Sequence, residues 1–280
     1  MYPRNFEYVA VESIDEAVEA LASSEFAKVM SGGMSLLPLM KLRLVSPDLV
    51  VDIGRISGLD SIDDQGDMVS IGALVRHYQT AQAQNLPKAL TQAASYTGDV
   101  QVRNQGTTVG AVVHGDLAAD QPSAVLALGG VIVAQGPNGI REIPADEFFV
   151  DALTTAVEPD EVVTAVKVRK GGMSAYDKLG RRGGRTDYAV AGASAWIQKE
   201  NGSISDARVA LTGVAAKPTL AAATAEALIG TDGSDRAVEE AAAKAADGVT
   251  ILEDLYGTVD YKTHLAKVFA KRAIKRALSG

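Results

Sequence analysis

The sequence contains no cysteine in its 280 residues. This absence excludes disulfide bonds, thiolate nucleophiles, and zinc or iron–sulfur sites with thiolate ligands. Histidine is scarce too, because only His77, His114 and His264 occur and they form no HxH or HxxxH pair. We interpret them as surface or hydrogen-bonded residues, and we expect no metal site within this chain. Any redox metal has to be held by another chain.

Long apolar runs and an excess of positive charge are also missing. Although 47% of the residues are hydrophobic, no run approaches the roughly 20 apolar residues that span a bilayer. The net charge of -8 disfavours extended contact with nucleic acid or an anionic membrane, since both require dense positive charge. Residues 1–6 lack the basic and apolar regions of a secretory signal, so we expect no membrane span and a cytoplasmic location.

The first part of the chain predicts alternating short helices and strands. Ser13 and Glu16 fit a capping box, after which apolar residues recur at helical spacing to residue 23. Apolar runs at 28–30 and 49–53 predict strands, which gives a small α/β unit over residues 1–55. Farther along, strands are expected at 68–72, 131–134 and 162–168, helices near 89–94 and 120–128, and a glycine-bearing loop region at 98–115.

Gly171 and Gly172 mark the expected link between two domains, 1–172 and 173–280. The first domain is expected to divide into subdomains at about residue 55. In the second domain, expected strands at 188–198 and 207–211 precede alanine-rich helical segments, an order typical of an α+β domain. The expected helices cover 219–228, 236–246 and 264–278.

The stretch from Ser31 to Ser35 (SGGMS) places two glycines between hydroxyl residues. Glycine permits positive φ and lets a ligand approach the main chain, and the serines add hydroxyl donors. Such a loop suits an anion such as a phosphate, particularly if residues 36–44 form a short helix with Pro38 in its first turn. The alternative is that the two glycines only form a tight turn.

A second loop, residues 103–111, again combines glycines with hydroxyls, and residues 114–120 (HGDLAAD) follow it. Two such loops could hold a diphosphate between them. Neither loop fits GxGxxG or GxxxxGK[ST], so the sequence does not predict a Rossmann or P-loop site.

Residues 31–41 (SGGMSLLPLMK) resemble the AGGxSLLPxMK segment of the FAD-binding medium subunits of molybdenum hydroxylases, the carbon monoxide dehydrogenase and xanthine dehydrogenase family. Residues 106–122 are similar to their GTIGGNxxxxDPxxDxP segment, and residues 178–182 and 187–189 match further positions in the second domain. The order and spacing of these segments agree over nearly the full chain, which makes the resemblance specific.

The resemblance implies a PCMH-type FAD-binding domain of two α/β subdomains, followed by a C-terminal α+β domain with a three-stranded antiparallel sheet and helices. FAD is the implied cofactor. The implied partners are a large subunit with the molybdenum cofactor and a small subunit with two [2Fe-2S] clusters, in a dimer of heterotrimers. The lack of cysteine agrees with this division, because this chain cannot ligate the clusters itself.

The resemblance also implies which residues contact FAD, whereas it implies no catalytic acid or base and no metal ligand in this chain. Residues 29–36 would form the first diphosphate loop and Thr107, Gly110 and Ala111 the second. Tyr188 matches an aromatic residue found beside the flavin ring in part of the family. The implied contacts are Val29, Met30, Ser31, Gly32, Gly33, Met34, Ser35, Leu36, Gly98, Thr107, Gly110, Ala111, Val113, Asp120, Val163, Lys178 and Tyr188.

Several positions depart from the family pattern. Val109, Gly110 and Ala111 stand where two glycines and an asparagine are usual, Leu117 replaces a proline, and Met34 stands where histidine or glutamine is common. The loss of one glycine and one amide donor could reshape the second loop.

Two groups of charged residues have two interpretations each. Asp116 and Asp120 could form a pair for acid–base chemistry, but we prefer helix capping and hydrogen bonds to flavin or ribityl hydroxyls. Arg181, Arg182 and Arg185 either pair with an acidic partner or lie near the FAD phosphates, or they form a solvated turn.

Three functions are compatible with the residues. The first is an oxidoreductase subunit that takes electrons from the [2Fe-2S] clusters of a partner and passes them to an external acceptor, the substrate being set by the large partner. The second is a freestanding FAD-dependent oxidase of a small alcohol or amine, for which we identify no base. The third is a scaffold that has lost FAD, supported only by Val109 and Ala111. We favour the first.

Overall fold

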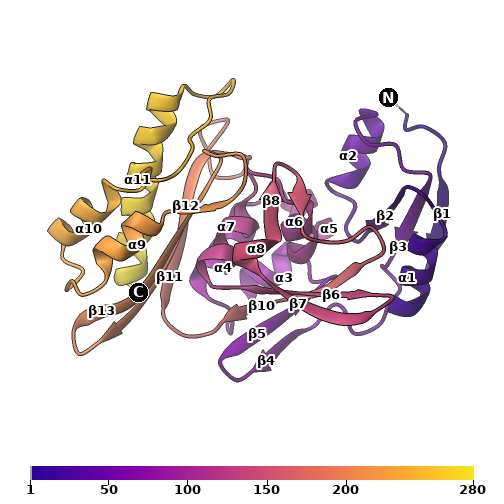
Figure 1. The fold of residues 1–280 in the computed structure, drawn as a ribbon, viewed down its shortest axis with the longest axis horizontal. Helices are drawn as coiled ribbons and strands as arrows, with labels where there is room; N and C mark the ends of the chain where they lie inside the picture. The colour runs from indigo at the N-terminus through magenta and orange to yellow at the C-terminus, as the bar shows by residue number, and fades with distance from the viewer. Residues whose placement is uncertain (1) are drawn as a thin grey trace.

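The computed structural model describes residues 2–280, in which three successive units follow the long axis of the molecule (Figure 1). The first holds a parallel sheet of order β1-β3-β2, the second a five-stranded antiparallel sheet of order β4-β5-β10-β6-β7, and the third an antiparallel sheet of order β11-β12-β13-β14. A two-stranded sheet, β8-β9, accompanies the second unit. The predicted α+β class is therefore confirmed.

The first unit covers the parallel strands with short helices. Its elements are β1 (Glu7–Ala10), α1 (Ile14–Ala22), β2 (Ala27–Met30), α2 (Leu36–Lys41) and β3 (Leu49–Asp52). Ser13 Oγ accepts a hydrogen bond from the Glu16 N–H at 3.2 Å, which confirms the predicted helix start. The Glu16 carboxylate accepts instead from the Glu12 N–H at 2.8 Å, one residue before the expected donor. Pro38 occupies the third position of α2, where no intrahelical donor is required.

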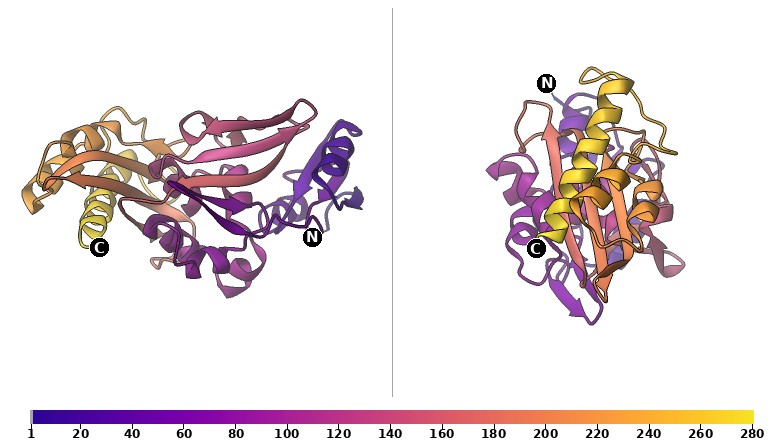
Figure 2. Two further views of the ribbon diagram at one scale, coloured as in Figure 1. Left: turned by 90° about the horizontal axis from the view of Figure 1, so that it is seen from below. Right: turned by 90° about the vertical axis from the view of Figure 1, so that its left-hand side faces the viewer.

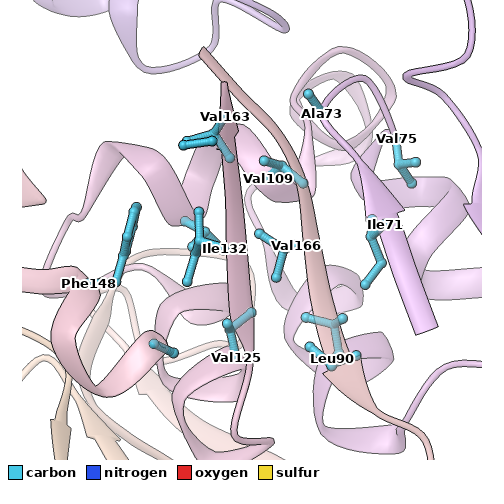
Figure 3. Close-up of a cluster of buried hydrophobic side chains, with 14 of the residues drawn as sticks. Ile71, Ala73, Val75, Leu90, Val109, Val125, Ile132, Phe148, Val163 and Val166 are labelled. Atoms are coloured by element: carbon cyan, nitrogen blue, oxygen red, sulfur yellow. The ribbon is translucent and has the colours of Figure 1, made fainter. Parts of the chain in front are cut away.

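The second unit packs helices against its sheet. Its elements are β4 (Ile62–Gln65), β5 (Met68–Gly72), α3 (His77–Gln82), α4 (Lys88–Tyr96), α5 (Val100–Gln105), α6 (Thr108–His114), α7 (Asp120–Ala127), β6 (Val131–Gly136), β7 (Gly139–Pro144), α8 (Ala145–Phe148), β8 (Phe149–Asp151), β9 (Thr154–Thr155) and β10 (Val162–Arg169). Val166 and Ile132 on neighbouring strands face Leu90, Val109 and Val125 of the helices (Figure 3). Burial of these side chains provides the main driving force that holds α4, α6 and α7 in place.

The loop predicted at 98–115 is wrong, because this region forms α5 and α6. Asp99 caps α5 by accepting from the Val102 N–H at 2.8 Å, and Thr107 caps α6 by accepting from the Gly110 N–H at 3.2 Å. The glycine at 106 separates the two helices. Asp99 and Thr107 were available in the sequence as helix-start signals, but the glycines of this region favoured the prediction of a loop.

The third unit places its helices on one face of a long-stranded sheet, and α11 crosses that face (Figure 2). Its elements are β11 (Met173–Gly180), β12 (Ala189–Glu200), β13 (Ser203–Thr212), β14 (Thr219–Leu220), α9 (Ala222–Leu228), α10 (Asp235–Ala242) and α11 (Val259–Leu278). The sheet has three long strands, as expected, with the two-residue β14 added at its edge. Thr219 and Leu220 therefore leave the predicted helix, which begins at Ala222.

Hydrogen bonds tie the second and third units together around α7. Ser123 and Ser194 hydroxyls lie 3.1 Å apart in the buried interface, and Arg208 donates to the Leu126 carbonyl at 3.1 Å. Thr212 Oγ1 donates to the Leu117 carbonyl at 2.8 Å. Contacts from the third unit therefore hold both α7 and the segment that leads into it. Within residues 2–280, no helix has the length and apolarity needed to cross a membrane.

Candidate cofactor site

The two glycine loops meet in the structure. The Ser31 and Thr107 hydroxyl oxygens lie 2.9 Å apart. Gly32 is buried against the neighbouring turn, where an added Cβ would overlap the Gln105 carbonyl oxygen and lie 2.8 Å from Gly106 Cα. Only a residue without a side chain permits this backbone contact. The expected pairing of the loops is therefore confirmed.

The first loop offers backbone donors that the protein does not use. Gly33 has φ of 69°, a left-handed conformation that turns the chain from β2 into α2. Across residues 2–280, no protein acceptor receives the N–H groups of residues 32–35. Backbone N–H groups in a partly buried position ordinarily find a partner, so this row of donors suits an oxygen-rich anionic ligand.

The second loop places the hydroxyl of Thr107 next to that of Ser31. Thr107 Oγ1 lies beside Ser31, and the Thr108 N–H donates to the Val75 carbonyl at 3.0 Å. A Cβ at Gly110 would lie 2.5 Å from Thr107 Oγ1 and 2.9 Å from Ser31 Oγ. Gly110 therefore leaves room for two hydroxyls to face the same small space.

A buried ion pair lies at the start of α7. Asp120 and Lys178 are 4% and 3% exposed, and the Lys178 ammonium lies 2.7 Å from one Asp120 oxygen and 2.8 Å from the other. Tyr176 also donates its hydroxyl to Asp120. Burial raises the pKa of the Asp120 carboxyl, and Lys178 and Tyr176 oppose that shift. Lys178 donates further to the Asp187 carbonyl at 2.6 Å, so the pair joins the second and third units.

A chain of buried polar groups connects Asp120 to His77. Gln121 Nε2 lies 3.1 Å from His77 Nδ1 and 2.6 Å from Thr97 Oγ1, and Thr97 reaches Asp120 at 3.4 Å. Burial, aided by the charge of Arg103, lowers the pKa of His77 to about 4, so the ring is neutral at pH 7. The Gln121 carbonyl oxygen has no partner among the described residues.

Tyr188 lies beside the segment that joins α6 to α7. The neighbouring Ala189 N–H donates to the Ala118 carbonyl at 3.0 Å, and the Tyr188 ring is 44% exposed. The guanidinium carbon of Arg181 lies 5.2 Å from the ring centroid. The ring therefore has one face against a cation and a large part of its surface open.

Comparison with known proteins agrees with this geometry. The profile of the FAD binding domain in molybdopterin dehydrogenase matches residues 4–169, and that of the CO dehydrogenase flavoprotein C-terminal domain matches residues 174–277. The carbon monoxide dehydrogenase medium chain of Hydrogenophaga pseudoflava is 38% identical, with 99% of this chain and 98% of that protein covered.

This chain belongs to the family of FAD-binding subunits of molybdenum hydroxylases. It is therefore an oxidoreductase flavoprotein subunit, and its cofactor is FAD.

Other members of the family extend the comparison. The nicotine 6-hydroxylase medium subunit of Paenarthrobacter nicotinovorans is 33% identical, with 96% of each chain covered. A solved structure of the Hydrogenophaga carbon monoxide dehydrogenase that lacks the Mo-pyranopterin moiety matches with a TM-score of 0.94 and 39% identity, covering 100% of this chain and 99% of that one. The quinoline 2-oxidoreductase of Pseudomonas putida 86 matches with a TM-score of 0.92 and 30% identity, with the same coverage.

The loop contact fits the diphosphate that FAD contains. Unpaired N–H groups, two facing hydroxyls and the absence of Cβ atoms at Gly32 and Gly110 are what a close-lying anionic linkage requires. When bound, FAD supplies redox chemistry that accepts electrons one at a time or in pairs.

The structure gathers the implied contact residues into two groups. Ser31, Gly32, Thr107 and Gly110 form the first group. Lys178, Asp120 and Tyr188 form the second, in which Lys178 pairs with Asp120 and donates to the carbonyl of Asp187, the neighbour of Tyr188. Gly98 adjoins the second group through Thr97, and its own carbonyl accepts from Arg103 at 2.8 Å.

The remaining implied residues lie in or beside these groups or in the core. Val29 and Met30 end strand β2, Leu36 begins α2, and Gly33, Met34 and Ser35 complete the first loop. Ala111 lies in the first turn of α6, where its N–H donates to the Thr107 carbonyl at 3.1 Å. Val113 and Val163 pack against the hydrophobic core, and Val163 is 7% exposed.

The departures in the second loop turn away from its hydroxyls. Val109 is 1% exposed and packs in the core near Val163 (Figure 3). Its larger side chain therefore fills space between α6 and the sheet. The glycine that remains, Gly110, is the one whose Cβ would crowd Ser31 and Thr107.

Sequence reasoning missed His77 and Gln121 as members of the site. It treated His77 as a surface or hydrogen-bonded histidine, and the structure shows the hydrogen-bonded, buried form. Gln121 stands inside the motif at 120–122, which was the available signal. Asp120 does not cap α7, because the cap position is Ala119. The Asp120 carboxylate instead accepts a hydrogen bond from Tyr176 and pairs with Lys178.

Proposed function

We propose that this subunit takes electrons from the [2Fe-2S] clusters of a partner subunit and passes them to an external acceptor. The observation that carries the proposal is the meeting of the two glycine loops, with paired hydroxyls and unused backbone donors, in a chain without cysteine. A chain without cysteine cannot ligate iron–sulfur clusters itself, so clusters that deliver electrons to its FAD would have to be held by another chain.

The residues of the two groups would divide the binding of FAD. We assign the diphosphate to residues 29–36 together with Thr107, Gly110 and Ala111. Asp120, Lys178 and Tyr188, with Gly98 nearby, would orient the flavin end, and Val113 and Val163 would close the apolar side. In this assignment the protein binds and orients its cofactor, and no side chain acts as an acid or base on substrate.

The proposed assembly has three kinds of subunit. The relatives' names, medium chain and medium subunit, support a complex with a large molybdenum-cofactor subunit and a small [2Fe-2S] subunit. We propose that two such heterotrimers associate and that the complex is cytoplasmic. Within this chain we propose a functional division at residue 172, supported by a second hydrophobic cluster whose members all follow the link.

Purification of the chain from its source without denaturant tests the proposed function. We expect one FAD per chain, iron–sulfur absorbance and two co-purifying subunits, with flavin reduction that depends on the small subunit. A lone FAD-containing chain that oxidises a small alcohol or amine would overturn the proposal in favour of a freestanding oxidase. A colourless chain that does not take up added FAD would contradict the cofactor assignment.

A further inference from the structure

Arg181 is held between two aromatic rings. Its guanidinium carbon lies 5.2 Å from the ring centroid of Tyr188 and 4.5 Å from that of Tyr256, which comes from a segment 75 positions later in the sequence. The Arg181 N–H also donates to the Tyr188 carbonyl at 2.9 Å. Arg181 Nε is buried and has no hydrogen-bond partner in the described part of the chain, so the aromatic rings are the side chain's main contacts.

The ring of Tyr256 is presented by an anchored turn. The Asp254 carboxylate accepts from the Tyr256 N–H at 2.8 Å and pairs with the Lys262 ammonium at 2.8 Å. Lys262 is buried and also donates to the Gly213 carbonyl at 2.9 Å. The turn is therefore tied to the end of β13, and Tyr256 backs Arg181 from a fixed position.

Gly213, which anchors the turn that carries Tyr256, also contacts the segment beside Tyr188. The Gly213 N–H donates to the Leu117 carbonyl at 2.7 Å, and Leu117 lies in the connection between α6 and α7. Partial burial is the main cause that raises the pKa of the Tyr188 hydroxyl. The nearby negative charges of Asp116 and Asp120 raise this pKa further. Tyr188 thus faces the flavin end of the proposed site on one side and Arg181 on another.

We propose that Arg181 is a positioning residue that fixes the ring of Tyr188 for stacking against the flavin, with Tyr256 as its backing. The proposal rests on the proposed placement of the flavin beside Tyr188. Arg181 covers one face of the tyrosine ring, and the 44% exposure of Tyr188 leaves surface for a flat ring. Arginine suits this role because its planar guanidinium stacks on two rings at once, which an ammonium cannot do equally well.

FAD titration of the purified full-length chain, followed by flavin fluorescence and by visible circular dichroism, tests the role of Arg181. We expect Tyr188→Leu to change the flavin circular dichroism and to weaken FAD binding about fivefold, the factor that corresponds to a stacking contact. Arg181→Met should produce the same spectral change, Arg181→Lys should restore only part of the native signal, and Tyr256→Leu should give a smaller change of the same kind. Tyr256→Phe keeps the ring and serves as the matched control.

The outcomes separate the two proposals. If Tyr188→Leu alters the flavin spectrum but Arg181→Met and Tyr256→Leu do not, the positioning role of Arg181 is wrong and the flavin placement stands. If FAD binds but Tyr188→Leu leaves its spectrum unchanged, the placement beside Tyr188 fails and the role of Arg181 fails with it. Should Arg181→Met not fold, Tyr256→Leu decides, because it removes the backing ring and leaves the arginine in place.

Discussion

The two ends of the proposed site are held together by different kinds of interaction. At one end, loops approach each other through glycine backbones and two hydroxyls, with no charged side chain in the contact between Ser31 and Thr107. At the other end, a fully buried carboxylate and ammonium join two structural units. The first end depends on the absence of side-chain atoms, whereas the second depends on a pair of charges that must be kept together.

This difference predicts where each end is sensitive. Backbone contacts fail when a Cβ intrudes, but they contain no buried charge that could lose its partner. Buried charges fail when one partner is removed, because the other is left unpaired in a low-dielectric interior. Substitutions at the loop end should therefore change FAD affinity more than stability, and substitutions at the ion pair should do the reverse.

The largest effect is expected for Lys178→Met. This substitution leaves Asp120 buried without its cation and removes the donor to the Asp187 carbonyl, at a cost of about 3–5 kcal/mol in the free energy of unfolding. Chemical denaturation of the purified chain measures the loss. Arg236→Ala breaks an exposed ion pair with Glu240 on α10 and is the control, with a change below about 1 kcal/mol. Equal losses for the two variants would contradict the comparison.

The pH dependence of stability should come next in size. His77 has a pKa near 4 in the folded chain and an ordinary value of 6.5, so the unfolded chain binds more protons between these values. Stability therefore rises with pH across this window, and acidification from 6.5 to 4 should cost up to about 3 kcal/mol through this residue. Denaturation of the native chain and of His77→Gln at several pH values in the window isolates the contribution. An unchanged pH slope in the variant would contradict it.

The third prediction concerns the loop end. Gly32→Ala places a methyl group against the Gln105 carbonyl and should weaken FAD binding at least tenfold, equivalent to about 1.4 kcal/mol. Gly171→Ala is the matched control, since a Cβ there meets no atom within 4 Å. Fluorescence titration with FAD measures both. If the control loses as much affinity as Gly32→Ala, then loop geometry does not govern the binding.

The same contrast explains what the sequence could predict. Glycines between hydroxyls identify a backbone-based contact locally, and the order of SGGMS and the 103–111 segment was enough to expect that the loops meet. The ion pair was different, because Asp120 and Lys178 are 58 positions apart and only the family resemblance brought them together. Arg181 and Tyr256 lie still farther apart, and no local pattern indicates their contact.

The missed elements have a related cause. Helices α5 and α6 have six and seven residues, too short for a clear periodic signal, and the glycines at 98, 106, 110 and 115 indicated a loop. Strand β11 was missed because its sequence, MSAYDKLG, does not alternate between apolar and polar residues. Six of its eight residues are nevertheless buried, and the strand packs against α4 and α11. The place of His77 in the site was not predicted, because its burial depends on packing against α6 and α7.

The smallest effect is expected where the two loops touch. Thr107→Ala removes both the cap of α6 and the hydroxyl that faces Ser31, so it should lower the free energy of unfolding by about 1 kcal/mol and weaken FAD binding severalfold. Thr107→Ser keeps the hydroxyl and should recover both properties. Thermal unfolding and FAD titration of the same samples compare the two effects. Because Thr107 serves both the fold and the proposed ligand contact, a loss of stability without a loss of affinity would place the hydroxyl in the fold alone and move the diphosphate away from α6.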